Sequence, residues 1–152
     1  WFIEIDEFDQ RERLLLNFGH TFGHAIEAST NFEVHHGVGV GAGMLIAGAY
    51  AKLSALLSDK GKVAVAALEE HIKAMLMPGA GRLIGAPRNV DLKSTLEKFN
   101  YDKKHKTDFF RMVVPERDGN LSLISVPRNE EEKEKIEAAF VEGFKILNWN
   151  FH

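Results

Sequence analysis

Apolar residues recur at helical spacing along most of the chain, whereas two stretches near residues 110 and 121 have the composition and flanking turn residues of strands. The pattern predicts helices over about residues 12–28, 37–57, 63–75, 91–99 and 130–147, and strands over residues 110–114 and 121–126. Asp118-Gly119 lies between the strands and is typical of a hairpin turn. The expected fold is mostly α with one small β-hairpin, and it lacks the β-α-β units of a cofactor-binding domain.

Three of these helices have further predicted details. Asn129 is expected to cap the last helix, and Asp91 lies where the first turn of the helix over 91–99 is expected. In the helix over residues 63–75, the spacing assigns an inner face to four residues: Val63, Ala67, Ile72 and Met75.

The first predicted helix carries a polar stripe. At 100° per residue, five side chains fall within roughly 80° of one another on this helix: Arg13, Asn17, His20, His24 and Glu27. A helix that packs on a core normally has Leu or Ile on such a stripe. The stripe therefore predicts a polar site, in preference to a solvated flank, where Lys and Glu are more usual.

Glycine occupies every second position from Gly37 to Gly43 at the start of the second predicted helix, which lowers helix stability. This pattern indicates that another backbone or a ligand comes close. It does not have the spacing of a dinucleotide-binding loop. Small residues at Gly39, Gly43 and Ala47 favour the simpler explanation, which is tight packing against another helix.

Composition narrows the range of functions. The 152 residues are 45% hydrophobic, which is enough for one domain with a real core, and the net charge of −3 argues against nucleic acid as a partner. Cysteine is absent, so any metal must use histidine, carboxylate or water, and a reducing compartment fits. Neither a membrane-spanning run nor a signal peptide is present, and we expect a cytoplasmic protein without membrane contact. Because the sequence opens on Trp1, we also expect a piece of a longer protein.

The histidines suggest a metal site. His20 and His24 are four residues apart and could chelate one ion, and His36 is an equally good partner for His20. Spacing alone does not choose between these pairs.

Several motifs together resemble one family. They are the run from Arg13 to Glu27, His36-Gly37, Gly43-Met44 and Asp102-Lys103-Lys104, with Asp6-Glu7 before them and Gly85-Ala86-Pro87 between. This series is similar to 3-dehydroquinate synthase and its relatives, the sugar phosphate cyclases. The resemblance implies that residues 1–152 form the C-terminal helical metal- and substrate-binding domain, and that the N-terminal NAD-binding domain is absent from this chain.

The resemblance also implies roles for individual residues. His20 and His36 would be two of three ligands of Zn²⁺ or Co²⁺, the third being a glutamate that would precede Trp1. Arg13 would bind the substrate carboxylate, which suits the two-pronged guanidinium. The remaining predicted substrate-binding residues are Asn17, His24 and Lys104 at the phosphate, Lys103 beside them, and Asp9 near the substrate hydroxyls. Glu27 is expected to have only a structural role.

The reaction implied is conversion of 3-deoxy-D-arabino-heptulosonate 7-phosphate to 3-dehydroquinate and phosphate, in the shikimate pathway of aromatic amino acid biosynthesis. NAD would be bound mainly by the N-terminal half, which is the expected partner of this chain. The full-length enzyme is expected to be a homodimer and the chain alone to be inactive.

Two positions depart from the family pattern and leave alternatives open. Val38 stands where an acidic residue is common, and Asp9 replaces the usual glutamate. A cyclase for another sugar phosphate, a polyol dehydrogenase resembling glycerol dehydrogenase, and a non-catalytic metal-binding helical module are the alternatives. Four further histidines have no motif around them and are expected to be surface or hydrogen-bonded residues: His35, His71, His105 and His152.

Overall fold

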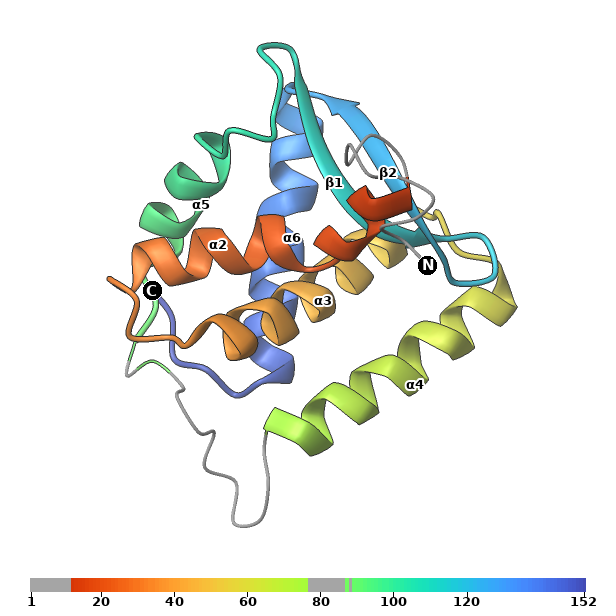
Figure 1. Cartoon of the computed structure of the whole chain (residues 1–152), viewed down its shortest axis with the longest axis horizontal. Coiled ribbons are helices and arrows are strands. Elements are labelled where there is room, and N and C mark those ends of the chain that lie inside the picture. The colour runs from red at the N-terminus through yellow and green to blue at the C-terminus, as the bar shows by residue number, and fades with distance from the viewer. Residues whose placement is uncertain (1–11, 77–86, 88) are drawn as a thin grey trace.

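The computed structural model describes residues 12–76, 87 and 89–152, with side chains from Leu15 onward. Its elements in chain order are the 3₁₀ helix η1 (Glu12–Asn17), α2 (His20–Ser29), α3 (His36–Leu53), α4 (Asp59–Leu76), α5 (Leu92–Asn100), β1 (Phe109–Glu116), β2 (Asn120–Pro127) and α6 (Glu130–Ile146). This mostly helical fold with one hairpin confirms the predicted class (Figure 1). Among the described residues, no helix combines the length and apolar character needed to cross a bilayer.

The hairpin is antiparallel, as predicted, and slightly longer than its sequence pattern indicated. Its register runs from Phe109 opposite Pro127 to Glu116 opposite Asn120. Gly119 has a φ of +100° in the connecting turn, a conformation that favours glycine. The Asp-Gly signal therefore marked the turn correctly.

Helix α3 lies at the centre of the molecule. Helices α2 and α6 pack on it, and β1 and α4 also contact it (Figure 1). The core beside it is rich in aromatic rings: Phe22 lies 5.2 Å from Phe99 and 5.5 Å from Phe140, between ring centroids. These ring contacts pack α2 against both α5 and α6.

Glycines allow α2 and α3 to approach each other closely. A Cβ atom at Gly23 would lie 2.7 Å from the Gly39 carbonyl oxygen, and one at Gly43 would overlap the Gly19 carbonyl. Ala47 is fully buried in the same helix. The close approach of another backbone, expected from the small residues of the second helix, is thus confirmed.

The single helix predicted over residues 12–28 is wrong. The chain forms η1, turns at Phe18 and Gly19, and only then enters α2. Gly19 has a φ of +80°, and a Cβ atom there would lie 2.5 Å from the Val40 carbonyl oxygen. The helix breaks because α3 occupies the space into which a continuous helix would place a side chain. Arg13 and Asn17 are consequently not on the same helix as His20, His24 and Glu27.

The second helix was predicted to reach residue 57, but α3 ends at Leu53. Ala55 has a φ of +53°, and Leu57 pairs with Arg117 at the hairpin turn. Leu57 is buried there, so burial of this side chain against the turn ends the helix early.

Helix α4 begins earlier than predicted, and its predicted inner face is largely wrong. Ile72 is buried, whereas Val63 is 70% exposed, Met75 is 59% exposed and Ala67 is also exposed. Gly61 decides the rotation of the helix, because a Cβ atom there would overlap the Arg117 carbonyl. With Gly61 against the hairpin turn, Val65 and Ile72 face the core instead.

Side-chain caps begin α5 and α6. Asp91 accepts a hydrogen bond from the Ser94 amide (3.0 Å), and Asn129 accepts one from the Glu132 amide (2.9 Å). The cap predicted at Asn129 is confirmed, whereas Asp91 stands just before the first turn rather than within it.

Candidate metal and substrate site

Three imidazole rings converge at the crossing of α2 and α3. The ring centroid of His20 lies 5.5 Å from that of His24 and 5.3 Å from that of His36, and His24 lies 5.7 Å from His36. His20 and His24 are one turn apart on α2, and His36 is the first residue of α3. The glycine contacts between the two helices bring these rings together.

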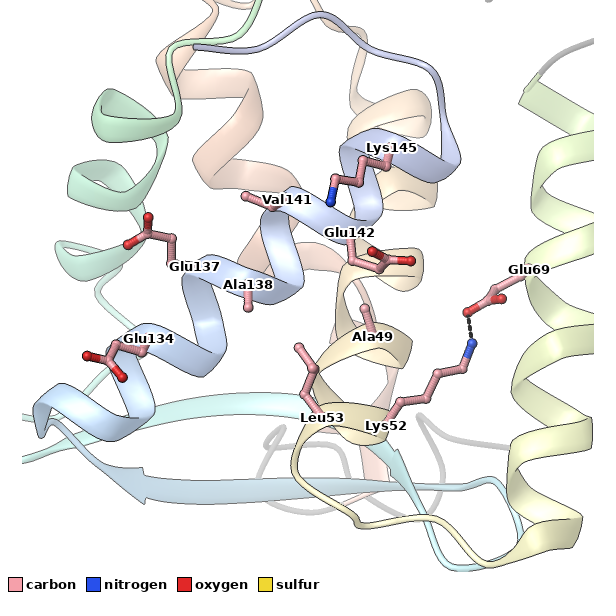
Figure 2. A pocket seen from close by; sticks show the side chains of 10 residues that line it. All are labelled: Ala49, Lys52, Leu53, Glu69, Glu134, Glu137, Ala138, Val141, Glu142 and Lys145. Atoms are coloured by element: carbon pink, nitrogen blue, oxygen red, sulfur yellow. Dashed lines mark hydrogen bonds and ion pairs between the residues drawn. The ribbon is translucent and has the colours of Figure 1, made fainter.

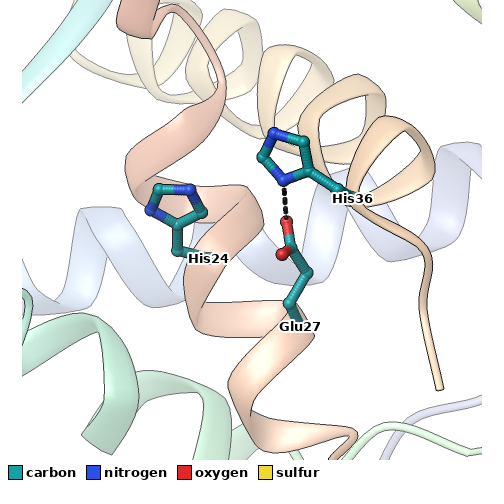
Figure 3. Close-up of side chains that lie close together, drawn as sticks. All are labelled: His24, Glu27 and His36. Carbon is teal, nitrogen blue, oxygen red and sulfur yellow. Dashed lines mark hydrogen bonds and ion pairs between the residues drawn. The ribbon is translucent and has the colours of Figure 1, made fainter. Parts of the chain in front are cut away.

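A buried carboxylate belongs to the same cluster. Glu27 is only 7% exposed, and its Oε1 lies 3.0 Å from Nδ1 of His36 (Figure 3). One donor atom from each of His24, Glu27 and His36 lies within 4.8 Å of the other two, close enough for these residues to share a metal ion.

The environment of His20 favours a neutral ring. Partial burial lowers the pKa of His20, and the positive charge of Lys104 lowers it further. The Phe18 carbonyl, 3.3 Å from Nδ1, acts in the opposite direction. A neutral imidazole is the form that can bind a metal.

Lys104 lies beside Asn17, with Nζ donating a hydrogen bond of 3.1 Å to Oδ1. The two side chains line a cavity of about 200 Å³ between η1, α2 and β1. Thr21 also lines this cavity and directly follows His20 on α2, so the cavity adjoins the imidazole cluster. An ammonium group and an amide next to clustered imidazoles suit an anionic group of a bound ligand.

The loop that carries Lys104 is held at two points. Asp102 Oδ1 accepts a hydrogen bond of 2.8 Å from the Lys104 amide, and His105 Nδ1 accepts one of 3.0 Å from the Arg111 amide. The His105 ring packs between Phe99 and Phe110, at centroid distances of 4.7 and 5.2 Å. These contacts fix the backbone on both sides of the lysine.

A second cavity, of about 600 Å³, opens between α3, α4 and α6. Figure 2 shows its side chains, with Lys52 and Glu69 joined by an ion pair of 2.5 Å. Its other charged residues are Glu134, Glu137, Glu142 and Lys145. None of the predicted site residues lines it, so the cavity beside Lys104 is the better candidate for substrate binding.

The family model of the 3-dehydroquinate synthase C-terminal region matches residues 2–105, which is more than half of the chain. The chain belongs to the 3-dehydroquinate synthase family. The match covers η1 to α5 and the lysine loop, and therefore every residue of the imidazole cluster and of the cavity pair Asn17 and Lys104.

Individual members of the family are similar over most of the chain. The 3-dehydroquinate synthase of Saccharolobus solfataricus is 36% identical over 129 residues, covering 82% of this chain and 35% of the relative. The enzyme of Shewanella halifaxensis is 34% identical over 138 residues, covering 90% of this chain and 36% of the relative. The chain thus spans about a third of the length of the curated relatives it matches.

A solved structure shares the fold. The crystal structure of 2-deoxy-scyllo-inosose synthase, complexed with carbaglucose-6-phosphate, NAD⁺ and Co²⁺, matches with a TM-score of 0.65 at 22% identity. The match covers 89% of this chain and 35% of that structure.

The residues predicted in this 3-dehydroquinate synthase family member are partly brought together. His20, His24 and His36 form the cluster, and Asn17 meets Lys104, whereas Lys103 is exposed. The predicted ligand pair His20 and His36 and the set His24, Glu27 and His36 share His36, and the assignment of ligands stays a prediction.

Some predictions lie outside the described residues. They concern Asp9, the side chain of Arg13, and the motifs at residues 6–7 and 85–86. Val38, the departure from the family pattern after His36-Gly37, is half-buried and packs on the core.

Three of the four histidines without a motif are where they were expected. His35, His71 and His152 are exposed, and His152 lies 2.8 Å from the Asn89 side-chain nitrogen. His105 meets the expectation only in part: it is half-buried and its Nδ1 accepts a hydrogen bond, whereas its Nε2 is buried without a hydrogen-bond partner among the described residues.

Sequence reasoning missed three residues of this site. Thr21 and Arg111 line the cavity beside Lys104, and Glu27 contacts His36 rather than only supporting the helix. A charged residue between the apolar Phe110 and Met112 was the available signal for Arg111. Thr21 carried no such signal, since its burial depends on tertiary packing that the sequence does not show.

Proposed function

We propose that this chain is the metal- and phosphate-binding part of a 3-dehydroquinate synthase, which converts 3-deoxy-D-arabino-heptulosonate 7-phosphate to 3-dehydroquinate and phosphate. The observation that carries the proposal is the hydrogen-bonded pair Lys104 and Asn17 beside three clustered imidazoles. Loss of phosphate from a substrate held by a metal requires metal-binding groups and phosphate-binding groups next to each other. Membership of the family supports this choice of reaction.

The donor groups fit zinc or cobalt. Imidazole nitrogens and carboxylates are ligands for both, and the chain has no cysteine to offer a thiolate. His20 and His36 would hold the ion, with a glutamate from the preceding part of the family's sequence as third ligand. When bound, the metal supplies Lewis-acid polarisation of the substrate's hydroxyl and carbonyl oxygens. The Co²⁺ in the related inosose synthase structure supports a divalent metal.

The chain's own residues would bind and orient the substrate. Lys104 would neutralise the departing phosphate, Asn17 and His24 would donate hydrogen bonds to it, and Arg13 would hold the carboxylate at the other end. Lys104 is well placed for this role because Asp102 and His105 fix its loop. Lys103 and Asp9 would complete the substrate-binding set.

NAD belongs to the larger part of the relatives that this chain does not span. When bound, NAD supplies the transient oxidation of a substrate alcohol that makes the neighbouring proton acidic. The N-terminal part of the enzyme is therefore the proposed partner. Zn²⁺ rather than Co²⁺, a homodimer of the full-length protein and a cytoplasmic location belong to the same proposal and rest on the resemblance.

The test is a chimera in which the N-terminal part of the Saccharolobus solfataricus relative precedes this chain. With NAD⁺ and Zn²⁺, we expect the chimera to release phosphate from the heptulosonate phosphate. Lys104→Met should reduce kcat/KM by about 10- to 100-fold, because a charge-assisted hydrogen bond contributes about 1.5–3 kcal/mol. Lys106→Met is the matched control, since Lys106 is an exposed lysine of the same loop.

A folded chimera that binds NAD⁺ and oxidises glycerol-like polyols without releasing phosphate would contradict the proposal in favour of a dehydrogenase. Equal loss of activity in the Lys104 and Lys106 variants would contradict the role of Lys104. Circular dichroism and NAD⁺ binding establish that each protein is folded before its activity is compared.

A further inference from the structure

Glu27 is a buried acid with a defined neighbour. Its side chain is 9% exposed, and within the described part of the chain its hydrogen-bonding partner is Nδ1 of His36. A buried carboxylate is costly unless it is paired, so this contact is favoured over any arrangement that leaves Glu27 alone. The ring of His36 is itself 59% exposed.

Gly39 leaves the space that this contact needs. A Cβ atom at Gly39 would lie 2.8 Å from Oε1 of Glu27 and 3.0 Å from its Cγ. Oε1 is the same atom that faces His36. The glycine three residues after His36 therefore accommodates the carboxylate at the position where it meets the ring.

The geometry points to Glu27 as a positioning residue that keeps the proton of His36 on Nδ1 and so leaves Nε2 as the atom available to a metal (Figure 3). An ionised carboxylate can only accept, so the nitrogen it faces must carry the proton. The other ring nitrogen then has a free lone pair, as ligand histidines require. The inference rests on the metal site of the proposed function.

Direct ligation by Glu27 is the competing arrangement, because its carboxylate lies within 4.8 Å of donor atoms of His24 and His36. The contact of 3.0 Å between Oε1 and Nδ1 favours positioning, since this is the distance of a hydrogen bond between the carboxylate and the ring. The two arrangements predict different behaviour for glutamine at this position. Glutamine keeps an oxygen that can accept from Nδ1, but it is a poor metal ligand.

The first experiment needs no metal. Nitrogen-15 NMR of the histidine rings in the chelator-treated chain, at about pH 8.5, reports which ring nitrogen carries the proton when ordinary imidazoles are neutral. His36 is assigned from the resonances that disappear in His36→Gln. We expect a proton on Nδ1 in the wild type and in Glu27→Gln, and a mixture of both tautomers in Glu27→Ala.

Gly39→Ala moves the carboxylate without removing it and should also produce a mixture of tautomers. Gly37→Ala is the matched control, because a Cβ atom there meets nothing within 4 Å, and it should leave the proton on Nδ1. The His105 ring, packed between Phe99 and Phe110, reports whether each variant keeps its fold.

The second experiment measures the Zn²⁺ affinity of the same variants in the chimera, because the proposed third ligand lies in its N-terminal part. Competition with a chelating dye gives the affinity. Glu27→Ala should weaken binding by about 10- to 100-fold, the usual effect of losing such a supporting contact, and Glu27→Gln should retain most of the affinity. Equal weakening by Ala and Gln would show that Glu27 is a ligand and overturn the inference. An unchanged His36 tautomer in Glu27→Ala would overturn it as well.

The two experiments separate this inference from the proposed function. If the wild-type chimera binds no Zn²⁺ but the tautomer follows Glu27, the metal part of the proposed function fails and the positioning of His36 stands. If the wild-type chimera binds Zn²⁺ but the tautomer ignores Glu27, positioning fails and the metal site stands.

Discussion

His105 connects the lysine loop to the hairpin through a single neutral ring. Its Nδ1 accepts the Arg111 amide proton, so a proton on that nitrogen would remove the acceptor. Burial lowers the pKa of His105, the positive charge of Arg128 acts in the same direction, and the negative charge of Asp102 opposes it. The folded chain therefore binds fewer protons at this ring than the unfolded chain does.

This difference predicts how stability depends on pH. Stability should fall as pH drops below about 6.5, the ordinary histidine pKa, because the unfolded chain then gains a proton that folded His105 resists. Replacing His105 by Asn, whose side-chain oxygen can still accept from Arg111, should lower the thermal midpoint near neutral pH. Between about pH 7.5 and 5.5, however, the midpoint of His105→Asn should fall less than that of the wild type.

Thermal unfolding at several pH values checks this expectation. His71→Asn is the control, because His71 is an exposed histidine on α4. The pKa of His20 is also lowered by burial, so part of the pH dependence should persist in His105→Asn. Parallel pH profiles of the wild type and His105→Asn would contradict the role given to His105.

The types of residue at the site could be predicted from the sequence more fully than the contacts between those residues. The sequence and its resemblance to a family indicated His20, His24, His36, Asn17 and Lys104, because these types suit metal and phosphate. The contact between Glu27 and His36 could not be inferred, since it depends on the distance between two helices. Glycines at Gly23 and Gly39 set that distance.

At the scale of elements, the crossing of α2 and α3 determines the imidazole cluster. Gly43→Ala should destabilise the chain by about 1–3 kcal/mol, because its Cβ atom would overlap the Gly19 carbonyl and force the helices apart. Urea unfolding measures the effect. Gly37 lies on the same helix, but a Cβ atom there would meet open space. Gly37→Ala should therefore raise the free energy of unfolding, by less than about 1 kcal/mol. Equal midpoints for both variants would contradict the importance of the crossing.

Local sequence could not have shown where the first helix breaks. Gly19 and Gly23 stand in the same Phe-Gly-His context, yet the first ends a turn with φ of +80° and the second lies inside α2. The difference is tertiary: Gly19 faces the Val40 carbonyl of α3. Apart from the first helix, helical periodicity gave the right helices and their approximate ends, but it contains no information about which glycine meets another element.

At the scale of the whole molecule, α4 is the least integrated helix. Ser58 and Gly61 fix its first turn against the hairpin, and Lys52 pairs with Glu69 farther along. Within the described chain only Gly61, Val65 and Ile72 of this helix are buried, whereas α3 is buried along most of its length. In Figure 1, α4 lies along one side of the fold.

This difference predicts uneven local stability. Backbone amides of α4 beyond its first turn should exchange with solvent at least roughly tenfold faster than those of α3, because a helix with few buried contacts can open without global unfolding. Native-state hydrogen exchange followed by NMR or mass spectrometry measures this. Equal protection in α3 and α4 would mean that α4 opens only when the whole chain unfolds.

The turn at Gly19 places Asn17 on a piece of backbone separate from the helices that carry the three clustered imidazoles. Asn17 precedes the turn, whereas the rings that would hold a metal follow it on α2 and α3. Substitutions in η1 or in the cavity wall can therefore change which group binds beside Lys104 while the crossing of α2 and α3 keeps the three imidazoles in place. Such an arrangement would let one scaffold acquire new substrates without rebuilding its proposed metal site.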